Sequence, residues 1–355
     1  MGKSILVRSP QREANQKKGG LINHPFWHVS DPELMRLVRV FTLPSSANPF
    51  AEDGVVIKVA AAPWETQYHK APLAREGILD GIQKGLITPG TTIVEATSGN
   101  TGHAMAAICN ILGLDFVAVI AGDVPESKIT VMRALGGGVS VRTPEKGKTT
   151  VDYARHLGAQ EGWYNPDQYG GEWNPQSHYE YLAPQLFKQT PASIFVAPGG
   201  TMGTCIGIAR YALEYGQFTK VIPVLCSEGQ EIPAARSLAR VKRDIRLPWQ
   251  EYFQESDIQF GSRYASLLLS FLSWRMRLPV QLGPSFGLAF VGALKFLREQ
   301  KAAGTLDAFR KHDGKVYTVV FGPDDYRPYT NLYLAERLYE RDFSKENLLE
   351  LIDLI

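Results

Sequence analysis

Short apolar runs alternate with amphipathic segments along most of the chain, and glycine or proline marks many of the changes in pattern. The apolar runs predict strands at 55–59, 92–95, 116–120, 139–142, 193–197, 221–226 and 316–321. Helical periodicity predicts helices at 73–84, 103–112, 126–135, 150–160, 176–189 and 207–215. Apolar strands that alternate with amphipathic helices predict an α/β fold whose parallel sheets are covered by helices on both faces.

The length of 355 residues predicts two domains, or one large domain with a lobe. Residues 1–30 are polar and contain glycine, which predicts a flexible arm. A hydrophobic fraction of 44% and a charged fraction of 21% are typical of globular proteins. Apolar residues in the segment 344–355 predict a helix that docks on the body of the protein or on a second subunit.

Charge and cysteine content exclude several classes of function. A formal net charge of +2 gives no field that would attract nucleic acid or an acidic membrane. The longest apolar run, 264–274, is too short to span a bilayer, and no signal peptide is recognised, so a cytoplasmic protein is expected. Cys109, Cys205 and Cys226 lack the spacing of a disulfide framework or a metal site, and each is expected to be a small buried hydrophobe.

Thr97–Gly102, with the sequence TSGNTG, follows a predicted strand and precedes a predicted helix. Ligands in open α/β sheets bind at the carboxyl ends of strands. Small hydroxyl residues and glycines at a helix N-terminus present several backbone N–H groups to a carboxylate or a phosphate. The alternative interpretation is an ordinary helix N-cap with turn glycines. We call this segment the asparagine loop.

Pro198–Thr204, with the sequence PGGTMGT, also lies between a strand and a helix. Its glycines let the backbone approach a ligand closely and its threonines add hydroxyl donors, which is the chemistry of a phosphate-binding loop. It matches neither the P-loop nor the dinucleotide-binding pattern. A glycine-rich loop of purely structural use is the alternative. We call this segment the phosphate loop.

Two anion-binding loops without a nucleotide signature suggest a phosphorylated cofactor that works on an anionic substrate. The asparagine loop is identical to the TSGNTG motif of the cysteine synthase and cystathionine β-synthase family, and GTMGT at 200–204 resembles that family's phosphate loop. Leu37–Arg39, Asp167–Tyr179 and Pro323–Tyr329 resemble further family segments in the same order. The chain therefore resembles this family of pyridoxal-phosphate enzymes over residues 35–330.

The resemblance implies two doubly wound α/β domains with mainly parallel sheets and the cofactor in the cleft between them, the tryptophan synthase β-like arrangement known as fold type II. We expect residues 55–168 to form a smaller, mobile domain that carries Lys70 and the asparagine loop. Residues 31–54 and 169–345 are expected to form a larger domain that carries the phosphate loop. Residues 346–355 are expected to be a C-terminal tail. The family is commonly homodimeric, which implies a homodimer.

The resemblance also assigns roles to individual residues. Lys70 precedes the asparagine loop by about thirty residues, as the family's cofactor lysine does, and would hold pyridoxal 5′-phosphate as a Schiff base. The other cofactor-binding positions would be Asn100, Gly200, Thr201, Met202, Gly203, Thr204 and, at the pyridine nitrogen, Ser285. A serine in place of an aspartate there favours β-elimination over transamination. The substrate-binding positions would be Thr97, Ser98, Thr101, Gln168 and Tyr68. No metal site is expected.

Three positions depart from the family pattern. Tyr68 replaces a small serine, Pro72 replaces an arginine, and Met202 replaces glycine or threonine in the phosphate loop. Ser285, which begins a predicted helix, could also be that helix's N-cap. These departures bear on the substrate, and Tyr68 is expected to narrow the substrate pocket or to hydrogen-bond the substrate.

The implied activity is a β-replacement on an activated serine or a cysteine-like amino acid through an aminoacrylate intermediate, as in cysteine biosynthesis. Lys70, once displaced from the cofactor, would remove the α-proton. The first alternative is a β-elimination lyase of the desulfhydrase type that releases pyruvate and ammonia. The second is a homologue that binds the cofactor with little turnover.

Overall fold

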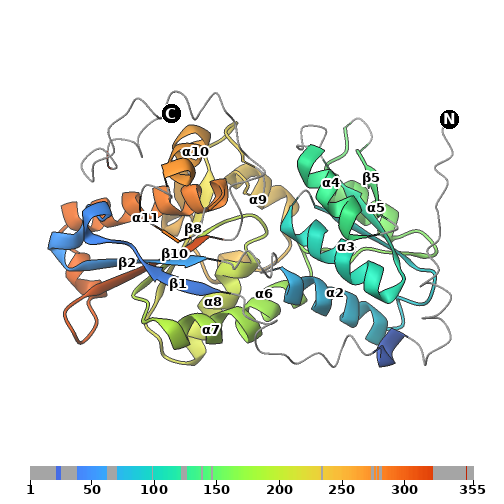
Figure 1. Ribbon diagram of the computed structural model, residues 1–355, viewed down its shortest axis with the longest axis horizontal. Helices are drawn as coiled ribbons and strands as arrows, with labels where there is room; N and C mark the ends of the chain where they lie inside the picture. Colours follow the sequence, from blue (N-terminus) through green and yellow to red (C-terminus); the bar gives the residue numbers. More distant parts are fainter. Residues whose placement is uncertain are drawn as a thin grey trace. The chain divides into compact units, whose positions relative to one another are not determined.

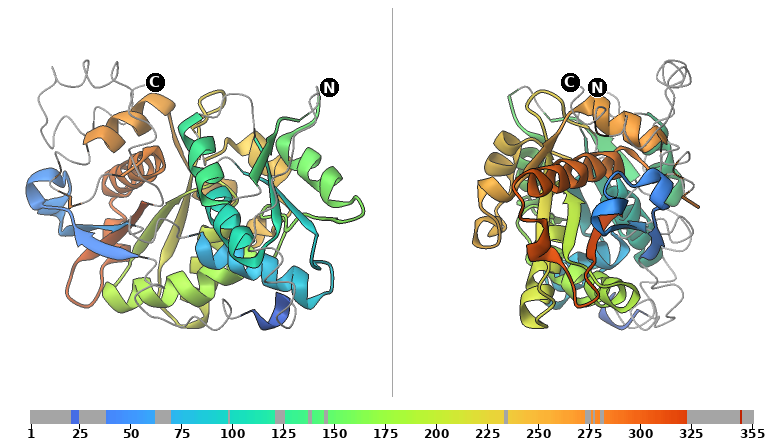
Figure 2. Two further views of the ribbon diagram at one scale, coloured as in Figure 1. Left: turned by 45° about the vertical axis from the view of Figure 1, so that its right-hand side comes forward. Right: turned by 90° about the vertical axis from the view of Figure 1, so that its left-hand side faces the viewer.

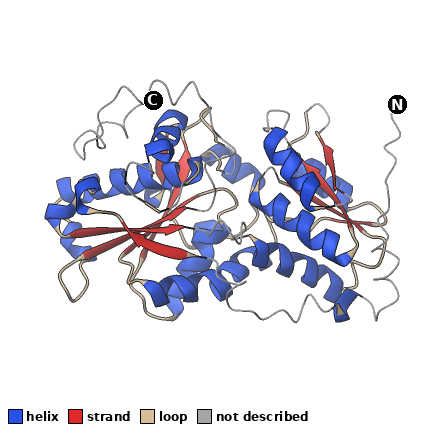
Figure 3. Ribbon diagram, viewed as in Figure 1, coloured by secondary structure: helices blue, strands red, loops and turns tan. Residues whose placement is uncertain are grey.

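The computed structural model describes residues 21–24, 38–61, 70–97, 99–120, 126–136, 139–144, 147–232, 235–272, 276, 278–279, 282–322 and 349. The chain forms two compact units (Figure 1). Unit 1 comprises residues 1–35 and 66–177, and unit 2 comprises residues 36–65 and 178–355. Each unit contains its own sheet, and helices accompany both sheets (Figure 3).

Unit 1 is built on a parallel sheet of four strands in the order β5-β4-β3-β6. The strands are β3 (Thr92–Ala96), β4 (Asp115–Val119), β5 (Val139–Arg142) and β6 (Trp163–Tyr164). The helices are α2 (Ala71–Gln83), α3 (Asn100–Leu112), α4 (Glu126–Leu135), α5 (Thr150–Gly158) and α6 (Trp173–Ser177), with a 3-10 turn η1 (Leu21–Asn23). The apolar faces of α2 and α3 and the inner residues of β3 and β4 bury one core, so the first residues of α3 are fixed beside the end of β3.

Unit 2 is built on six strands in the order β1-β2-β10-β7-β8-β9. They are β1 (Arg39–Thr42), β2 (Val55–Ala61), β7 (Ile194–Pro198), β8 (Lys220–Cys226), β9 (Gln259–Gly261) and β10 (Val316–Gly322). The strand β1 pairs antiparallel with β2, and the other pairs are parallel. A long helix contacts β7 to β10 and extends across this sheet (Figure 2).

That long helix is α11 (Pro284–Ala302), and it follows α10 (Arg263–Leu272). The remaining helices of unit 2 are α7 (Ala183–Gln189), α8 (Gly203–Glu214) and α9 (Leu238–Asp244), and a π-helical turn η5 spans His178–Leu182. The 3-10 turns are η3 (Ser45–Ala47), η4 (Ala51–Asp53), η6 (Trp249–Glu251), η7 (Glu255–Asp257) and η8 (Leu306–Phe309).

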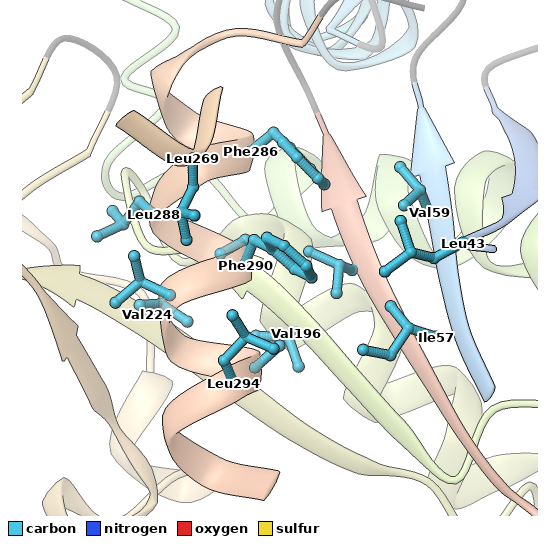
Figure 4. Close-up of a cluster of buried hydrophobic side chains, with 14 of the residues drawn as sticks. Leu43, Ile57, Val59, Val196, Val224, Leu269, Phe286, Leu288, Phe290 and Leu294 are labelled. Atoms are coloured by element: carbon cyan, nitrogen blue, oxygen red, sulfur yellow. The ribbon is translucent and has the colours of Figure 1, made fainter. Parts of the chain in front are cut away.

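The core of unit 2 lies between α11 and the sheet (Figure 4). Phe286 and Phe290 stack with ring centroids 5.5 Å apart, and both side chains are completely buried. Gly287 brings α10 against α11, because a Cβ added there would lie 1.8 Å from the carbonyl oxygen of Ser266. Burial of an aromatic or leucine side chain contributes about 1.5–3 kcal/mol, so this packing holds the start of α11 firmly in place.

The fold class expected from the pattern is confirmed: both sheets are mainly parallel and alternate with helices. Each of the seven predicted strands is present, with ends that differ by two residues at most. The helix expected over 176–189 is interrupted, because α6 ends at Ser177, a π-helical turn follows, and α7 starts with Pro184 in its first turn. The strands β1, β6 and β9 were not predicted; they are two to four residues long, too short for a periodic signal.

The boundaries of the two units differ from those expected for the two domains. The segment Val55–Ala61 was expected in the smaller domain, but it is the strand β2 of unit 2, hydrogen-bonded to β1 and β10 along its length. Unit 1 also extends to Ser177 and not to residue 168. Trp173 packs against Gly77 of α2, which ties α6 to unit 1.

Other expectations concern single features of the chain. Cys109, Cys205 and Cys226 are buried, as expected of small hydrophobes. Among the helices of the described ranges, none is long and apolar enough to cross a bilayer. Of the predicted C-terminal tail the structure describes Leu349, which packs against the core of unit 2. The predicted arm lies outside the described residues except for 21–24.

Candidate functional site

The two predicted loops occupy equivalent places in their sheets. In unit 1 the chain passes from β3 to β4 and β5 on one side, and β6 lies on the other side of β3. In unit 2 it passes from β7 to β8 and β9 on one side, and β10 lies on the other. In open α/β sheets, ligands bind at the carboxyl ends of the strands, at the point where the strand order reverses. The asparagine loop follows β3 and the phosphate loop follows β7.

Close packing fixes the asparagine loop at the start of α3, which is labelled in Figure 1. Thr97 is buried, and its backbone N–H donates to the carbonyl of Val119 on β4 at 3.1 Å. Glycine at position 102 allows close packing, because a Cβ there would lie 2.7 Å from the sulfur of Met132 and 2.9 Å from the methyl group of Thr97 and would displace these side chains. The glycine therefore lets the helix approach Thr97.

Gln168 joins the asparagine loop from the carboxyl end of β6, the neighbour of β3. Its side-chain Nε2 donates to the carbonyl of Ala96 at 2.8 Å, and its Oε1 accepts from the hydroxyl of Thr101 at 2.9 Å. Asn174 Nδ2 donates to the Gln168 carbonyl at 2.7 Å. Gln168 is only 3% exposed. The structure therefore brings together Thr101 and Gln168, two residues predicted to bind the substrate.

The direction of these bonds determines what each side chain can offer to a ligand. A backbone carbonyl only accepts, so the group of Gln168 that faces Ala96 is its NH₂. Its oxygen therefore faces Thr101, and the Thr101 hydroxyl must donate its hydrogen to it. An Nε2 group carries two hydrogens, so Gln168 retains donor capacity beyond the bond to Ala96.

Glu95 is a buried acid that sequence reasoning did not assign to the site. It is completely buried on β3, where Oε1 accepts from the N–H of Ala96 at 2.9 Å and Oε2 from the N–H of Gln168 at 3.1 Å. Burial raises its pKa to about 8, with a further contribution from the charge of Asp167. The signal in the sequence was an acidic residue in the apolar strand TIVEA, directly before the asparagine loop.

An ion pair stabilises the turn that carries Gln168. Arg155 on α5 bonds both carboxylate oxygens of Asp167, with Nε–Oδ2 and Nη2–Oδ1 distances of 3.0 and 3.2 Å. Asp167 has a φ of 59°, a left-handed conformation that its N–H bond to the Asn165 side chain supports. Arg155 thus stabilises the strained residue immediately before Gln168.

Lys70 and Asn100, two further site residues predicted in unit 1, lie at the starts of two helices that pack together. Lys70 is the N-cap residue of α2 and is half-buried, and Asn100 is the first residue of α3 and is also half-buried. Tyr68 and Ser98 lie outside the described residues. The predicted role of each in binding substrate stays a prediction.

In unit 2 the phosphate loop connects β7 to α8. Met202 is the N-cap residue of α8 and has a φ of 66°, and its side chain is buried. Backbone bonds fix Gly199 near the start of the loop, since its N–H donates to the carbonyl of Val224 at 2.8 Å and the N–H of Arg236 donates to its carbonyl at 3.1 Å. A Cβ on Gly199 would lie 2.2 Å from a methyl carbon of Leu225. The loop is therefore held mainly through its backbone.

The helix that follows this loop supplies donors for an anion. The first N–H groups of a helix have no partner within it, and the helix dipole favours negative charge there. Gly203 and Thr204 form the first turn of α8 and are buried, whereas Gly200 and Thr201 before it are half-buried. This set of backbone N–H groups and threonine hydroxyls suits a phosphate group.

His178 is a second residue near a predicted ligand whose role could not be predicted from the sequence. The hydroxyl of Thr204 and the Nε2 of His178 lie 3.2 Å apart, and His178 is 1% exposed. His178 opens the π-helical turn η5, which contacts α8. The imidazole thus orients the hydroxyl of one predicted phosphate ligand.

Ser285 is completely buried in the first turn of α11. The N-cap residue of this helix is Gly283, with φ and ψ of −79° and −180°, so the alternative interpretation of Ser285 as the N-cap is wrong. Pro284 fills the first helical position, where a missing N–H removes no helical bond. The hydroxyl of Ser285 is therefore not needed to cap the helix.

Comparisons with known proteins agree with this geometry. A family model described as "Pyridoxal-phosphate dependent enzyme" matches residues 68–256, more than half of the chain. Cysteine synthase B of Pseudomonas aeruginosa is 33% identical over 156 residues, which cover 43% of this chain and 52% of that protein. Cystathionine beta-synthase of Rattus norvegicus is 28% identical over 296 residues, 76% of this chain and 49% of that enzyme.

A solved structure shows the same fold over most of the chain. The cysteine synthase of Entamoeba histolytica superposes with a TM-score of 0.70 at 19% identity, covering 91% of this chain and 95% of that one. The chain spans about half the length of the curated relatives it matches. The matched range includes Lys70, both loops and Gln168. The chain belongs to the pyridoxal-phosphate dependent enzymes.

Proposed function

We propose that this protein catalyses a β-replacement on an activated serine or a cysteine-like amino acid, with chemistry like that of a cysteine synthase. The observation that carries the proposal is the buried network of Gln168, Thr101 and Ala96 at the carboxyl end of β3. This network holds the side-chain NH₂ of Gln168 beside the N-terminus of α3, and such a pair of donors suits the α-carboxylate of an amino acid.

The phosphate loop fits the cofactor that this family uses. Glycines, a left-handed Met202 and two threonines at the N-terminus of α8 form a donor set for a dianionic phosphate. When bound, pyridoxal phosphate supplies an aldehyde that condenses with amines and a ring that withdraws electrons from the α-carbon. We assign its phosphate to Gly200, Thr201, Gly203 and Thr204, and its pyridine nitrogen to Ser285.

Lys70 is assigned two tasks. Its Nζ would hold the cofactor covalently and, once released by the substrate amine, would take the proton from the α-carbon. The leaving group would depart from the β-carbon with its bonding electrons, a nucleophile would add to that carbon, and Lys70 would return the proton to the α-carbon. We assign Asn100 to hydrogen-bond the phenolic oxygen of the cofactor.

The hydrogen-bond directions refine the roles predicted for the substrate-binding residues. Because Thr101 donates to Gln168, its hydroxyl orients the amide and is not itself a donor to a carboxylate. We propose that the second hydrogen of Gln168 Nε2 and the N–H groups at the start of α3 bind the substrate carboxylate. Thr97, Ser98 and Tyr68 keep their predicted roles around it, and the homodimer also stays a prediction.

The test combines spectroscopy with product analysis. The purified protein, loaded with pyridoxal phosphate, is titrated with O-acetylserine, O-phosphoserine, cysteine and serine while its visible absorption is recorded. A change in the cofactor band identifies the amino acid that binds as donor. Sulfide is then added, and cysteine, pyruvate and ammonia are quantified. Cysteine formation with the donor supports β-replacement.

The other outcomes separate the alternatives. Pyruvate and ammonia without a replacement product would assign the protein to the β-elimination lyases. A loaded protein whose spectrum responds to none of the four amino acids would contradict the proposed substrate class. A protein that takes up no cofactor would contradict the residue assignments altogether.

A further inference from the structure

We infer that Glu95 is a positioning residue that holds Gln168 in place for the substrate carboxylate, and that its ionisation adjusts the affinity for the amino-acid donor. The inference rests on the proposed function, since it concerns the carboxylate-binding part of the same site. No step of the mechanism above uses Glu95.

The geometry shows how one carboxylate controls two segments. Oε1 accepts from Ala96 N–H and Oε2 accepts from Gln168 N–H. The side chain of Gln168 returns to the same place, because its Nε2 donates to the Ala96 carbonyl. Two hydrogen bonds therefore fasten the end of β3 to the turn after β6, and the bond from Ala96 N–H orients the Glu95 carboxylate within β3. Because Glu95 holds the backbone N–H of Gln168 at 3.1 Å, it also sets the direction in which the side-chain amide of Gln168 points.

Few charges act on Glu95 from the elements around it. The turn after β6 contributes Asp167, which opposes ionisation, and α5 contributes Arg155, which favours it. Tyr164 on β6 is close enough for the charge of Glu95 to raise the pKa of its phenol. The neighbouring strand β4 contributes Asp115, which pairs with Thr92, three residues before Glu95 on β3. Since Asp167 is itself paired with Arg155, burial dominates the ionisation of Glu95.

Ionisation changes the strength of the two bonds that Glu95 accepts. A carboxylate accepts N–H bonds more strongly than a neutral acid, in which one oxygen carries a proton. The charged form of Glu95 should therefore hold Gln168 more tightly. Because burial raises the pKa to about 8, this change falls in a range where enzyme assays are practical. The expected effect is on donor binding, and the chemical step should change little.

The experiment compares wild type with Glu95→Gln and, as a matched control, Glu161→Gln, an exposed acid in the same unit. Glutamine places an NH₂ group against one of the two backbone N–H groups. Above pH 8, where Glu95 is charged in wild type, we expect the substitution to raise KM for the donor about tenfold and to leave kcat within about threefold, which is the effect of one lost hydrogen bond to a charged group. In wild type, KM should fall as pH rises through about 8, and in Glu95→Gln this inflection should disappear.

A second measurement needs no activity. Protein loaded with cofactor and labelled with ¹⁵N-glutamine shows the Gln168 backbone N–H as one resonance, assigned with Gln168→Asn. This resonance should move with pH in wild type and in Glu161→Gln, and should be independent of pH in Glu95→Gln.

Each outcome decides one of two questions. A KM inflection that persists in Glu95→Gln, or a Gln168 resonance that does not titrate in wild type, would overturn the role of Glu95. An absence of β-replacement activity in wild type would instead contradict the proposed function, and the resonance would still test the contact.

Discussion

The asparagine loop and the phosphate loop follow equivalent strands of their sheets, yet the protein holds them by different means. The side chain of Gln168, distant in the sequence, bonds Thr101 of the asparagine loop and the carbonyl of Ala96, and Glu95 on β3 holds the Gln168 backbone. The phosphate loop is fixed mainly by backbone bonds of Gly199 and by a left-handed Met202. A side-chain hydrogen bond from outside the loop joins Thr204 to His178.

This difference corresponds to what each loop is proposed to bind. A cofactor phosphate stays bound through every turnover, and a rigid set of backbone donors suits it. A substrate carboxylate must bind and leave in each cycle. The side-chain network of the asparagine loop includes the buried acid Glu95, and we propose that it responds to the ligand and to pH through that group. The variants that follow test this contrast, beginning with the largest expected effect.

Lys70→Ala should have the largest effect, because it removes the nitrogen assigned to hold the cofactor and to take the α-proton. Activity should fall by at least about 1,000-fold, and borohydride should no longer fix the cofactor to the protein. The control is Lys84→Ala at the other end of α2, an exposed lysine paired with Asp80. Substantial activity in Lys70→Ala would show that another group carries the chemistry.

Glu95 should make the stability of the protein depend on pH in a defined direction. Its native pKa of about 8 lies above the ordinary value of 4.5, so between these values the native state holds a proton that the unfolded state has released. The wild-type free energy of unfolding should therefore fall as pH rises across this window, by at most roughly 1.4 kcal/mol per pH unit from this group, and level off above about 8.

Urea unfolding of wild type and Glu95→Gln between pH 5.5 and 8.5 measures this slope, since the other titrating groups cancel in the difference. The variant should gain stability relative to wild type as pH rises. Glu161→Gln should follow wild type at every pH, because residue 161 is exposed. A constant difference between wild type and Glu95→Gln would mean that Glu95 titrates near its ordinary pKa.

Thr204→Val tests the contact of the phosphate loop with His178. It removes a hydrogen-bond partner of the buried His178 and a hydroxyl assigned to the phosphate. Loss of such a bond costs about 1–3 kcal/mol. We expect about a tenfold weaker affinity for the cofactor by fluorescence titration and a lower urea midpoint. Thr204→Ser keeps the hydroxyl and should behave like wild type; an equal loss in both variants would implicate the methyl group instead.

The sequence predicted the parts of the molecule that depend on local patterns. The buried strands were predicted from their apolar runs. Both loops were predicted because small polar residues follow such a run within a few positions. Glu95 and His178 were not assigned roles, because their importance comes from contacts with Gln168 and Thr204, 73 and 26 residues away along the chain. The assignment of the strand β2 to the smaller domain was also wrong. Its partner β10 lies about 260 residues later in the sequence, and no local pattern predicts that pairing.

Met202 is a position where the sequence departed from the family and where the structure now gives a physical reason. Its left-handed φ of 66° costs a side-chain-bearing residue about 1 kcal/mol or more, which glycine avoids. Its side chain, however, is only 2% exposed, and burial of a methionine contributes about 1.5–3 kcal/mol. Burial outweighs strain, so Met202→Gly should destabilise the protein slightly, by about 1 kcal/mol.

The comparison that isolates the strain is Met202→Gly against Met202→Ala. Both lose the buried side chain, but only alanine keeps the left-handed penalty, so the glycine variant should be the more stable by about 1 kcal/mol in urea unfolding. At Ala212, inside the right-handed helix α8, alanine should be the more stable residue. Ala212→Gly should therefore lower the free energy of unfolding by about 1 kcal/mol. If alanine were the better residue at position 202 as well, the phosphate loop would not depend on its backbone conformation, and the contrast with the asparagine loop would fail at its central point.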